Sequence, residues 1–192
     1  MPDANPHALE FLLNRRSRPA KMLGLPVPSR AELTPILTAA ARSPDHGKLE
    51  PWRFVVLERA ALLRLAGLVE ACGARLGKSE DEIAKAHSQF ADGHLAVAVV
   101  EVQKPSEKVP AIEMTYSAGA VCLALLNAAL ASGWGANWLS GWASHDREFV
   151  QAALGLQDDE RIAGFIHLGT ERAAPPERPR PDLEAITTWV SE

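Results

Sequence analysis

Residues Ala40–Glu58, AARSPDHGKLEPWRFVVLE, join the end of a predicted amphipathic helix to the start of a predicted strand. Ser43-Pro44 ends the helix, and Pro51 introduces an apolar strand. The loop Asp45–Lys48 between these prolines carries one imidazole and one ammonium group. Because proline fixes φ and biases the preceding residue away from helix, we expect this loop to be a rigid ledge. Polar groups on such a loop often contact a ligand.

Composition places the chain among ordinary globular proteins. It has 192 residues, of which 47% are hydrophobic and 23% are charged, enough to bury a substantial core. The net charge of −4 and the pI near 5.9 argue against a nucleic-acid partner, which favours a basic surface. Cys72 and Cys122 are far apart in apolar surroundings, which predicts buried, reduced thiols rather than a disulfide or a metal site.

Neither a signal peptide nor a membrane span is expected. The first residues, MPDANPHALEFLLNRR, contain no long apolar region. No uninterrupted apolar stretch reaches the roughly 18 residues that a membrane helix needs. We therefore expect a cytoplasmic protein without a membrane partner.

Hydrophobic periodicity and capping signals predict one α+β domain over residues 1–192. The helices are expected at 6–14, 29–41, 60–76, 79–90, 110–132 and 146–154, and the strands at 52–58, 95–102, 135–141 and 161–170. Ser29 and Ser79 each form a capping box with a glutamate three residues later. Pro35 lies deep in the second helix, so we expect a separate first turn or a kink there.

The longest predicted helix, 110–132, is apolar nearly all round and rich in small residues. Such a helix must be buried on several sides, in the domain centre or at a subunit interface. The tail 171–192 is punctuated by prolines and ends in apolar residues, which predicts an extended arm that packs on another surface, such as a second subunit.

Common catalytic motifs are missing from the sequence. Residues 73–79, GARLGKS, have one residue too few for a P-loop, and no G-x-G-x-x-G motif precedes a helix. The histidines show no metal-binding spacing, and His167 is expected to be a hydrogen-bonded core residue. Ser117 lies in mid-helix, where a nucleophile elbow cannot form. A chain without its own catalytic group can take its chemistry from a cofactor.

Arg15, Arg16 and Ser17 follow the first predicted helix. Two guanidiniums and a hydroxyl at the end of an element can bind an oxyanion, because arginine offers a rigid fork of donors. The same residues also fit a solvated basic helix end that complements the helix dipole. Local chemistry alone leaves both interpretations open.

Several motifs, taken in chain order, resemble the nitroreductase family of FMN-dependent oxidoreductases. They are Asn14-Arg15-Arg16-Ser17, residues 41–46 (ARSPDH), 50–54 (EPWRF), the small-residue helix, 133–141 (GWGANWLSG) and 164–170 (GFIHLGT). The Pro-Asp-His form of the loop resembles the short subgroup of NAD(P)H nitroreductases. The resemblance covers nearly the whole chain up to Thr170.

The resemblance implies an α+β sandwich, with a mainly antiparallel central sheet flanked by helices, that forms a homodimer with one FMN in each of two interface clefts. Arg15, Arg16 and Ser17 match the segment that holds the FMN phosphate and ribityl chain. Arg42 and His46 match flavin contacts made from the opposite subunit. The remaining matches are Trp138, Leu139 and Ser140 along the flavin, and Ala128 near the nicotinamide cofactor.

By the same resemblance, a hydride passes from NAD(P)H through the flavin to a nitroaromatic, quinone or similar small acceptor by a ping-pong mechanism, and no side chain is a covalent catalyst. Two alternatives share the same binding residues. One is an FMN-holding or redox-sensing protein with little turnover, and the other is a different flavin enzyme on this fold. The segment 74–94, expected to cover the substrate, would separate them.

The chain departs from larger family members at two places. Their basic residue two positions after the serine is replaced here by Pro19, with Arg18 and Lys21 on either side. The resemblance therefore leaves open which residue places positive charge near the flavin N1–C2 carbonyl. Arg178 or Arg180 could replace their basic C-terminal motif.

Overall fold

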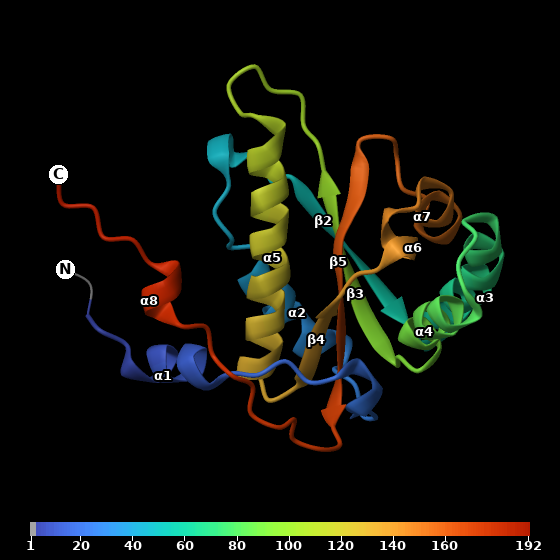
Figure 1. Cartoon of the computed structure of the whole chain (residues 1–192), viewed down its shortest axis with the longest axis horizontal. Helices are drawn as coiled ribbons and strands as arrows, with labels where there is room; N and C mark the ends of the chain where they lie inside the picture. Colours follow the sequence, from blue (N-terminus) through green and yellow to red (C-terminus); the bar gives the residue numbers. More distant parts are fainter. Residues whose placement is uncertain (1–2) are drawn as a thin grey trace.

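The computed structural model describes residues 3–192, in which helices cover both faces of one five-stranded sheet (Figure 1). The sheet has the order β1-β5-β3-β2, with β4 also paired to β5, and every pairing is antiparallel. The strands are β1 (Leu23–Gly24), β2 (Trp52–Glu58), β3 (Leu95–Val102), β4 (Gly135–Leu139) and β5 (Glu160–Glu171). The predicted α+β class with a mainly antiparallel sheet is confirmed.

The central strand β3 explains the two-layered core. Its side chains alternate between the two faces, and seven of its eight positions are buried. Val97 and Val99 join the core on the side of α2 (Arg30–Ala40) and α5 (Ala111–Ala131). Ala96 and Val100 point to the other core. A continuous valine-rich run is therefore what this position requires.

Four helices cover the second face of the sheet, on the right in Figure 1. They are α3 (Arg59–Arg75), α4 (Glu80–Ala91), α6 (Trp142–His145) and α7 (Arg147–Leu154). Phe90 from α4 meets Phe165 of β5 edge-on, with ring centroids 5.3 Å apart. This contact fixes the end of α4 against the middle of the sheet.

Most predicted element boundaries agree with the structure to within one or two residues, and both capping boxes are present. A separate first turn before Pro35, one of the two expectations, is wrong, because α2 runs as one helix through that residue. The short helices α6 and α8 (Leu183–Ile186) were not predicted, since four residues are too few for a periodic pattern.

His167 differs from its prediction in an important way. It is buried in β5, with only 2% of its surface exposed, as expected of a core residue. Neither ring nitrogen has a hydrogen-bond partner, so the expectation of a hydrogen-bonded histidine is wrong. Burial lowers the pKa of His167 to about 4. The ring is therefore neutral at physiological pH.

Helix α5 is long and apolar enough to cross a membrane by length and composition alone. Its packing gives another reason for that composition, because α5 lies against α2 on one side and against three strands on another. Met114, Val121 and Leu125 are among its buried residues. The helix is therefore explained as the core helix of this fold.

Two terminal segments project from the body and lie near each other on one side of it (Figure 1). Helix α1 (Pro6–Asn14) begins as predicted, with the Asn5 side chain accepting a bond from the Ala8 amide, but it buries no residue. Its apolar stripe and the apolar side chains of the C-terminal arm are exposed: Leu9, Leu12, Leu13, Leu183, Ile186, Trp189 and Val190.

Candidate functional site

The segment that follows α1 is held along strand β4. The Arg18 amide donates to the Ala136 carbonyl at 2.8 Å, and the Asn137 side-chain amide donates to the Arg18 carbonyl at 2.8 Å. The short 3₁₀ helix η1 (Ala20–Met22) follows. These bonds hold the chain at Arg18 against β4. The predicted Arg15–Ser17 segment therefore lies next to β4 and the residues that follow it.

Positive charge gathers at this segment. Arg15 donates from Nη2 to the Ser17 hydroxyl at 3.0 Å, whereas its Nε is buried without a partner. Burial lowers the pKa of Arg15, and the nearby charges of Arg180, Arg16 and Arg18 lower it further. A buried, unpaired donor within a group of cations is the environment in which an anion binds favourably.

Two carboxylates offset part of this charge. Glu171 at the end of β5 pairs with Arg18 Nε at 2.7 Å. Glu177, from the C-terminal arm, lies 3.3 Å from Arg16 Nη1 and 3.1 Å from Arg180 Nη2. The arm therefore brings a carboxylate to one of the two arginines that sequence analysis assigned to phosphate binding.

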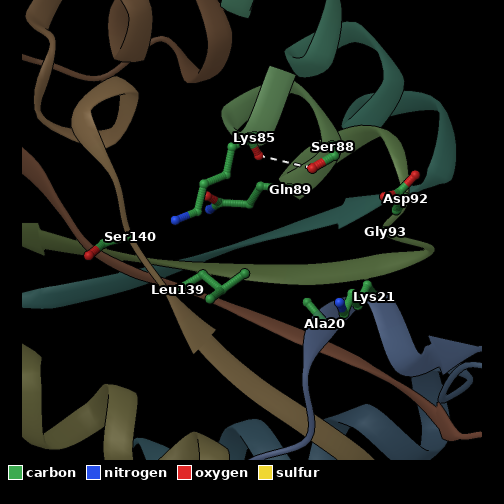
Figure 2. A pocket seen from close by; sticks show the side chains of 9 residues that line it. All are labelled: Ala20, Lys21, Lys85, Ser88, Gln89, Asp92, Gly93, Leu139 and Ser140. Carbon is green, nitrogen blue, oxygen red and sulfur yellow. Dashed lines mark hydrogen bonds between the residues drawn. The ribbon is translucent and has the colours of Figure 1, made fainter. Parts of the chain in front are cut away.

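A cleft of about 330 Å³ adjoins the segment (Figure 2). Its walls are η1, the C-terminal half of α4 and the end of β4. The lining residues are Ala20, Lys21, Lys85, Ser88, Gln89, Asp92, Gly93, Leu139 and Ser140. Predicted site residues Leu139 and Ser140 thus line this cleft, while Arg15 and Arg16 line an adjacent one of about 380 Å³.

Gln89 carries a second unpaired donor. Its Nε2 atom is buried without a hydrogen-bond partner. The side-chain oxygen of the same residue lies 3.8 Å from the position that a Cβ on Gly141 would occupy. The amide is therefore set beside the end of β4, where a ligand in the cleft could pair with it.

Trp138 lies one residue before the cleft-lining pair, and 37% of its surface is exposed. Its indole covers Gly164 of β5 so closely that a Cβ at that glycine would overlap the ring. The absence of a side chain at Gly164 therefore sets how the indole lies along the sheet.

His46 lies on the ledge, beside the N-terminal end of α5, and Arg42 follows the end of α2 before the ledge begins. The His46 Nδ1 atom is 2.7 Å from a carboxylate oxygen of Glu113, in the first turn of α5. Arg15 and Arg16 share their cleft with Leu130, in the last turn of α5. Because the helix has 21 residues at about 1.5 Å each, about 30 Å separates its ends. One chain does not bring His46 and Arg16 together.

The ledge itself is tightly shaped, as its two prolines predicted. The Glu50 amide donates to the Asp45 carboxylate at 2.7 Å. Lys48 and Glu50 both have positive φ, at 56° and 47°, which is costly for residues with a side chain. Such strain concentrates at functional sites.

Ala128, predicted near the nicotinamide cofactor, lies in the last turns of α5. It is partly buried and packs against the core between α5 and the sheet. It does not line either of the two clefts beside Arg15–Lys21.

Sequence analysis did not single out Lys85, Ser88 or Gln89, although it assigned the segment around them to substrate covering. Their spacing of three and four residues places them on one face of α4. That polar stripe was readable from the sequence. What was not readable was that this face of α4 meets the end of β4, because the two are far apart in the chain.

Comparison with known proteins decides the family. The model of the nitroreductase family matches residues 14–170. The chain is 37% identical over 163 residues to the Escherichia coli K12 protein named "Putative NAD(P)H nitroreductase YdjA", with 85% of this chain and 87% of that protein covered. The chain belongs to the nitroreductase family. The resemblance of the sequence motifs up to Thr170 is thereby confirmed.

Solved structures of nitroreductases share the fold. The nitroreductase-like family protein from Bacillus cereus superposes with a TM-score of 0.78 at 21% identity, covering 99% of this chain and 98% of that one. A Desulfovibrio desulfuricans structure, described as a "putative nitroreductase in complex with FMN", gives a TM-score of 0.76 at 19% identity, covering 99% and 100%.

Proposed function

We propose that this nitroreductase binds FMN and uses NAD(P)H to reduce a small acceptor, such as a nitroaromatic or a quinone. Family membership supports an oxidoreductase, and an FMN complex is described for a structure of the same fold. The proposal therefore turns on whether the residues of this chain fit the flavin.

The observation that carries the proposal is the guanidinium group at Arg15–Arg18. A phosphate monoester brings a charge near −2, and its oxygens accept strong hydrogen bonds from charged donors. Arg15 Nε has no partner, and the pKa of Arg15 is lowered by burial and by neighbouring cations. We assign Arg15, Arg16 and Ser17 to the FMN phosphate and ribityl chain. Arg180 would add a further positive charge near the phosphate.

The cleft in Figure 2 fits the ring system of the flavin. Leu139 offers an apolar surface, and the unpaired Gln89 Nε2 can donate to a ring carbonyl. We assign Trp138, Leu139 and Ser140 to contacts along the flavin. Lys21 lies on the opposite wall and supplies the positive charge that the resemblance expects near the N1–C2 carbonyl.

A second copy of the chain completes each site in this proposal. His46 lies about one helix length from Arg16, so we assign it, together with Arg42 just before its loop, to the flavin bound by the partner subunit. The exposed apolar side chains of α1 and of the arm 171–192 support a homodimer, because such residues are normally covered. We take residues 1–192 as one domain whose arm packs on the partner, in a cytoplasmic protein.

When bound, FMN supplies two-electron chemistry, accepting a hydride from NAD(P)H and later passing the electron pair to the acceptor. The chain binds and orients: the arginines fix the phosphate, and Gln89 and Lys21 set the ring. Donor and acceptor would use the same open side of the cleft in turn, as a ping-pong mechanism requires. Ala128 remains a proposed contact of the nicotinamide cofactor.

The test begins with the visible spectrum of the purified protein and identification of the released flavin. Anaerobic mixing with NADH or NADPH should then bleach the flavin absorbance, and a nitroaromatic or quinone should restore it. A preparation that binds no flavin would refute the cofactor assignment. A bound flavin that neither nucleotide reduces would favour the flavin-holding or sensing alternative instead.

A further inference from the structure

The cleft beside Arg15–Lys21 contains charged side chains to which the flavin assignment gives no role. Its lining includes two ammonium groups, Lys21 and Lys85, and one carboxylate, Asp92. Among residues 3–192, none of these three has an oppositely charged side chain within ion-pair distance. The cleft is therefore net positive, and its charges are not consumed by pairing.

Lys85 would ordinarily be explained as a solvated helix cation paired along α4. The structure shows Lys85 exposed on α4 but does not show the pairing. Glu82, three residues before it, is occupied, since it pairs with Lys78 Nζ at 3.0 Å and completes the capping box with Ser79. Asp81, four residues before it, forms no ion pair with Lys85 in the described chain.

The Lys85 side chain instead extends over the cleft. Figure 2 shows it reaching from α4 toward the Ser140 side, above Leu139. Ser88 on the same helix face donates its hydroxyl to the Lys85 carbonyl at 3.0 Å, so the hydroxyl is turned back to the helix. Lys85 therefore contributes the cation of this wall, next to an apolar floor.

We propose that Lys85, the ammonium of this cleft that the flavin assignment does not use, makes the cleft selective for substrates that carry an anionic group. The inference rests on the proposed function and names a substrate class for the same site. A free ammonium on the wall of a cleft that holds the flat flavin ring fits a flat substrate ring with a carboxylate at its edge. The same ammonium could instead pair with the 2′-phosphate that NADPH carries and NADH lacks, and the experiment separates these two sources.

The experiment follows the two half-reactions separately by stopped-flow absorbance of the flavin. Enzyme reduced with NADH is mixed with 4-nitrobenzoate or with 4-nitrobenzamide, which has similar shape and no charge. The reductive half-reaction is measured with NADPH and with NADH. The variants are Lys85→Gln, Lys85→Arg as the charge-conserving partner, and Lys108→Gln as a control in the exposed loop before α5.

Lys85→Gln should lower the preference for an anionic substrate by roughly two- to five-fold, the range that one exposed ion pair supplies. Lys85→Arg and Lys108→Gln should retain it, and added salt should remove it, because exposed charges are screened. A loss confined to 4-nitrobenzoate identifies the acceptor as the anion, and a loss confined to NADPH identifies the dinucleotide phosphate.

The inference would be overturned if wild type and Lys85→Gln showed the same preference for 4-nitrobenzoate over 4-nitrobenzamide and the same preference for NADPH over NADH. That outcome differs from failure of the proposed function, in which neither nucleotide reduces the flavin of the wild-type protein. If the flavin is reduced and reoxidised at rates that do not depend on substrate charge, the role of Lys85 is refuted and the reductase proposal is not affected.

Discussion

His167 should make the stability of this protein fall as the pH drops from neutral toward 5. The pKa of this histidine is lowered from 6.5 to about 4 by burial. The unfolded chain therefore binds a proton that the folded chain does not bind, so folding is favoured above the ordinary pKa and weakened below it. The window of the effect runs from about pH 6.5 down to about pH 4.

The size of the effect follows from the two pKa values. The linkage relation gives a loss of about 2 kcal/mol between pH 7.5 and pH 5, and about 3 kcal/mol at pH 4. For a chain of this length, about 2 kcal/mol corresponds to roughly 4–8 °C in melting temperature. Carboxylates with lowered pKa values, such as Glu160, weaken folding mainly below pH 5. Above pH 5 His94 adds to the effect in the same direction, because burial and the charge of Arg59 lower its pKa as well.

His167→Leu removes the titrating ring. The ring sits tightly, because a Cβ on Gly93 would lie 3.1 Å from its Nδ1 atom, and leucine is close to histidine in volume. Two unpaired buried nitrogens are also removed, each of which costs folding free energy. At neutral pH the free energy of unfolding of the variant should equal or exceed that of wild type. The margin on this comparison is the roughly 1.5 kcal/mol that reshaping a core can cost.

The assay is urea denaturation followed by tryptophan fluorescence at several pH values, at fixed protein and flavin concentrations, because binding shifts apparent stability. The wild-type curve of stability against pH should be steeper between pH 7.5 and 5 than the His167→Leu curve, which keeps only the contribution of His94. His145→Gln, at an exposed histidine, is the control and should follow wild type. Parallel curves for wild type and His167→Leu would refute the reasoning.

Three further outcomes are expected. Arg16→Ala should weaken FMN binding, measured by equilibrium dialysis, by about 1.5–3 kcal/mol, which is the contribution of a charged hydrogen bond. Lys48→Ala on the ledge should weaken it less, and equal losses would contradict the phosphate assignment. Glu177→Gln should tighten FMN binding, because the carboxylate 3.3 Å from Arg16 competes with the phosphate; unchanged affinity would show that the arm does not compete. Glu160→Gln should lower the unfolding free energy by about 1.5–3 kcal/mol, since it weakens the two-bond pair with Arg53 (2.5 and 2.7 Å); a loss below 1 kcal/mol in urea titration would count against it.

Local signals were sufficient for most of the secondary structure. Capping boxes at Ser29 and Ser79 and the valine-rich run of β3 depend on neighbours in the chain, so they were readable directly. No separate first turn forms before Pro35, because packing of α2 against α5 outweighs one lost hydrogen bond. Tertiary burial likewise left His167 without the partner that its polarity predicted.

The sequence by itself determined the elements, the nitroreductase resemblance and the residue types available to hold a flavin. Only the tertiary structure decided which of them meet. It joined Lys85 and Gln89 of α4 to Leu139 across one cleft, and it set Arg16 and His46 at opposite ends of α5. The physical reason is that a side chain's type is local, whereas its neighbours depend on how distant helices and strands pack.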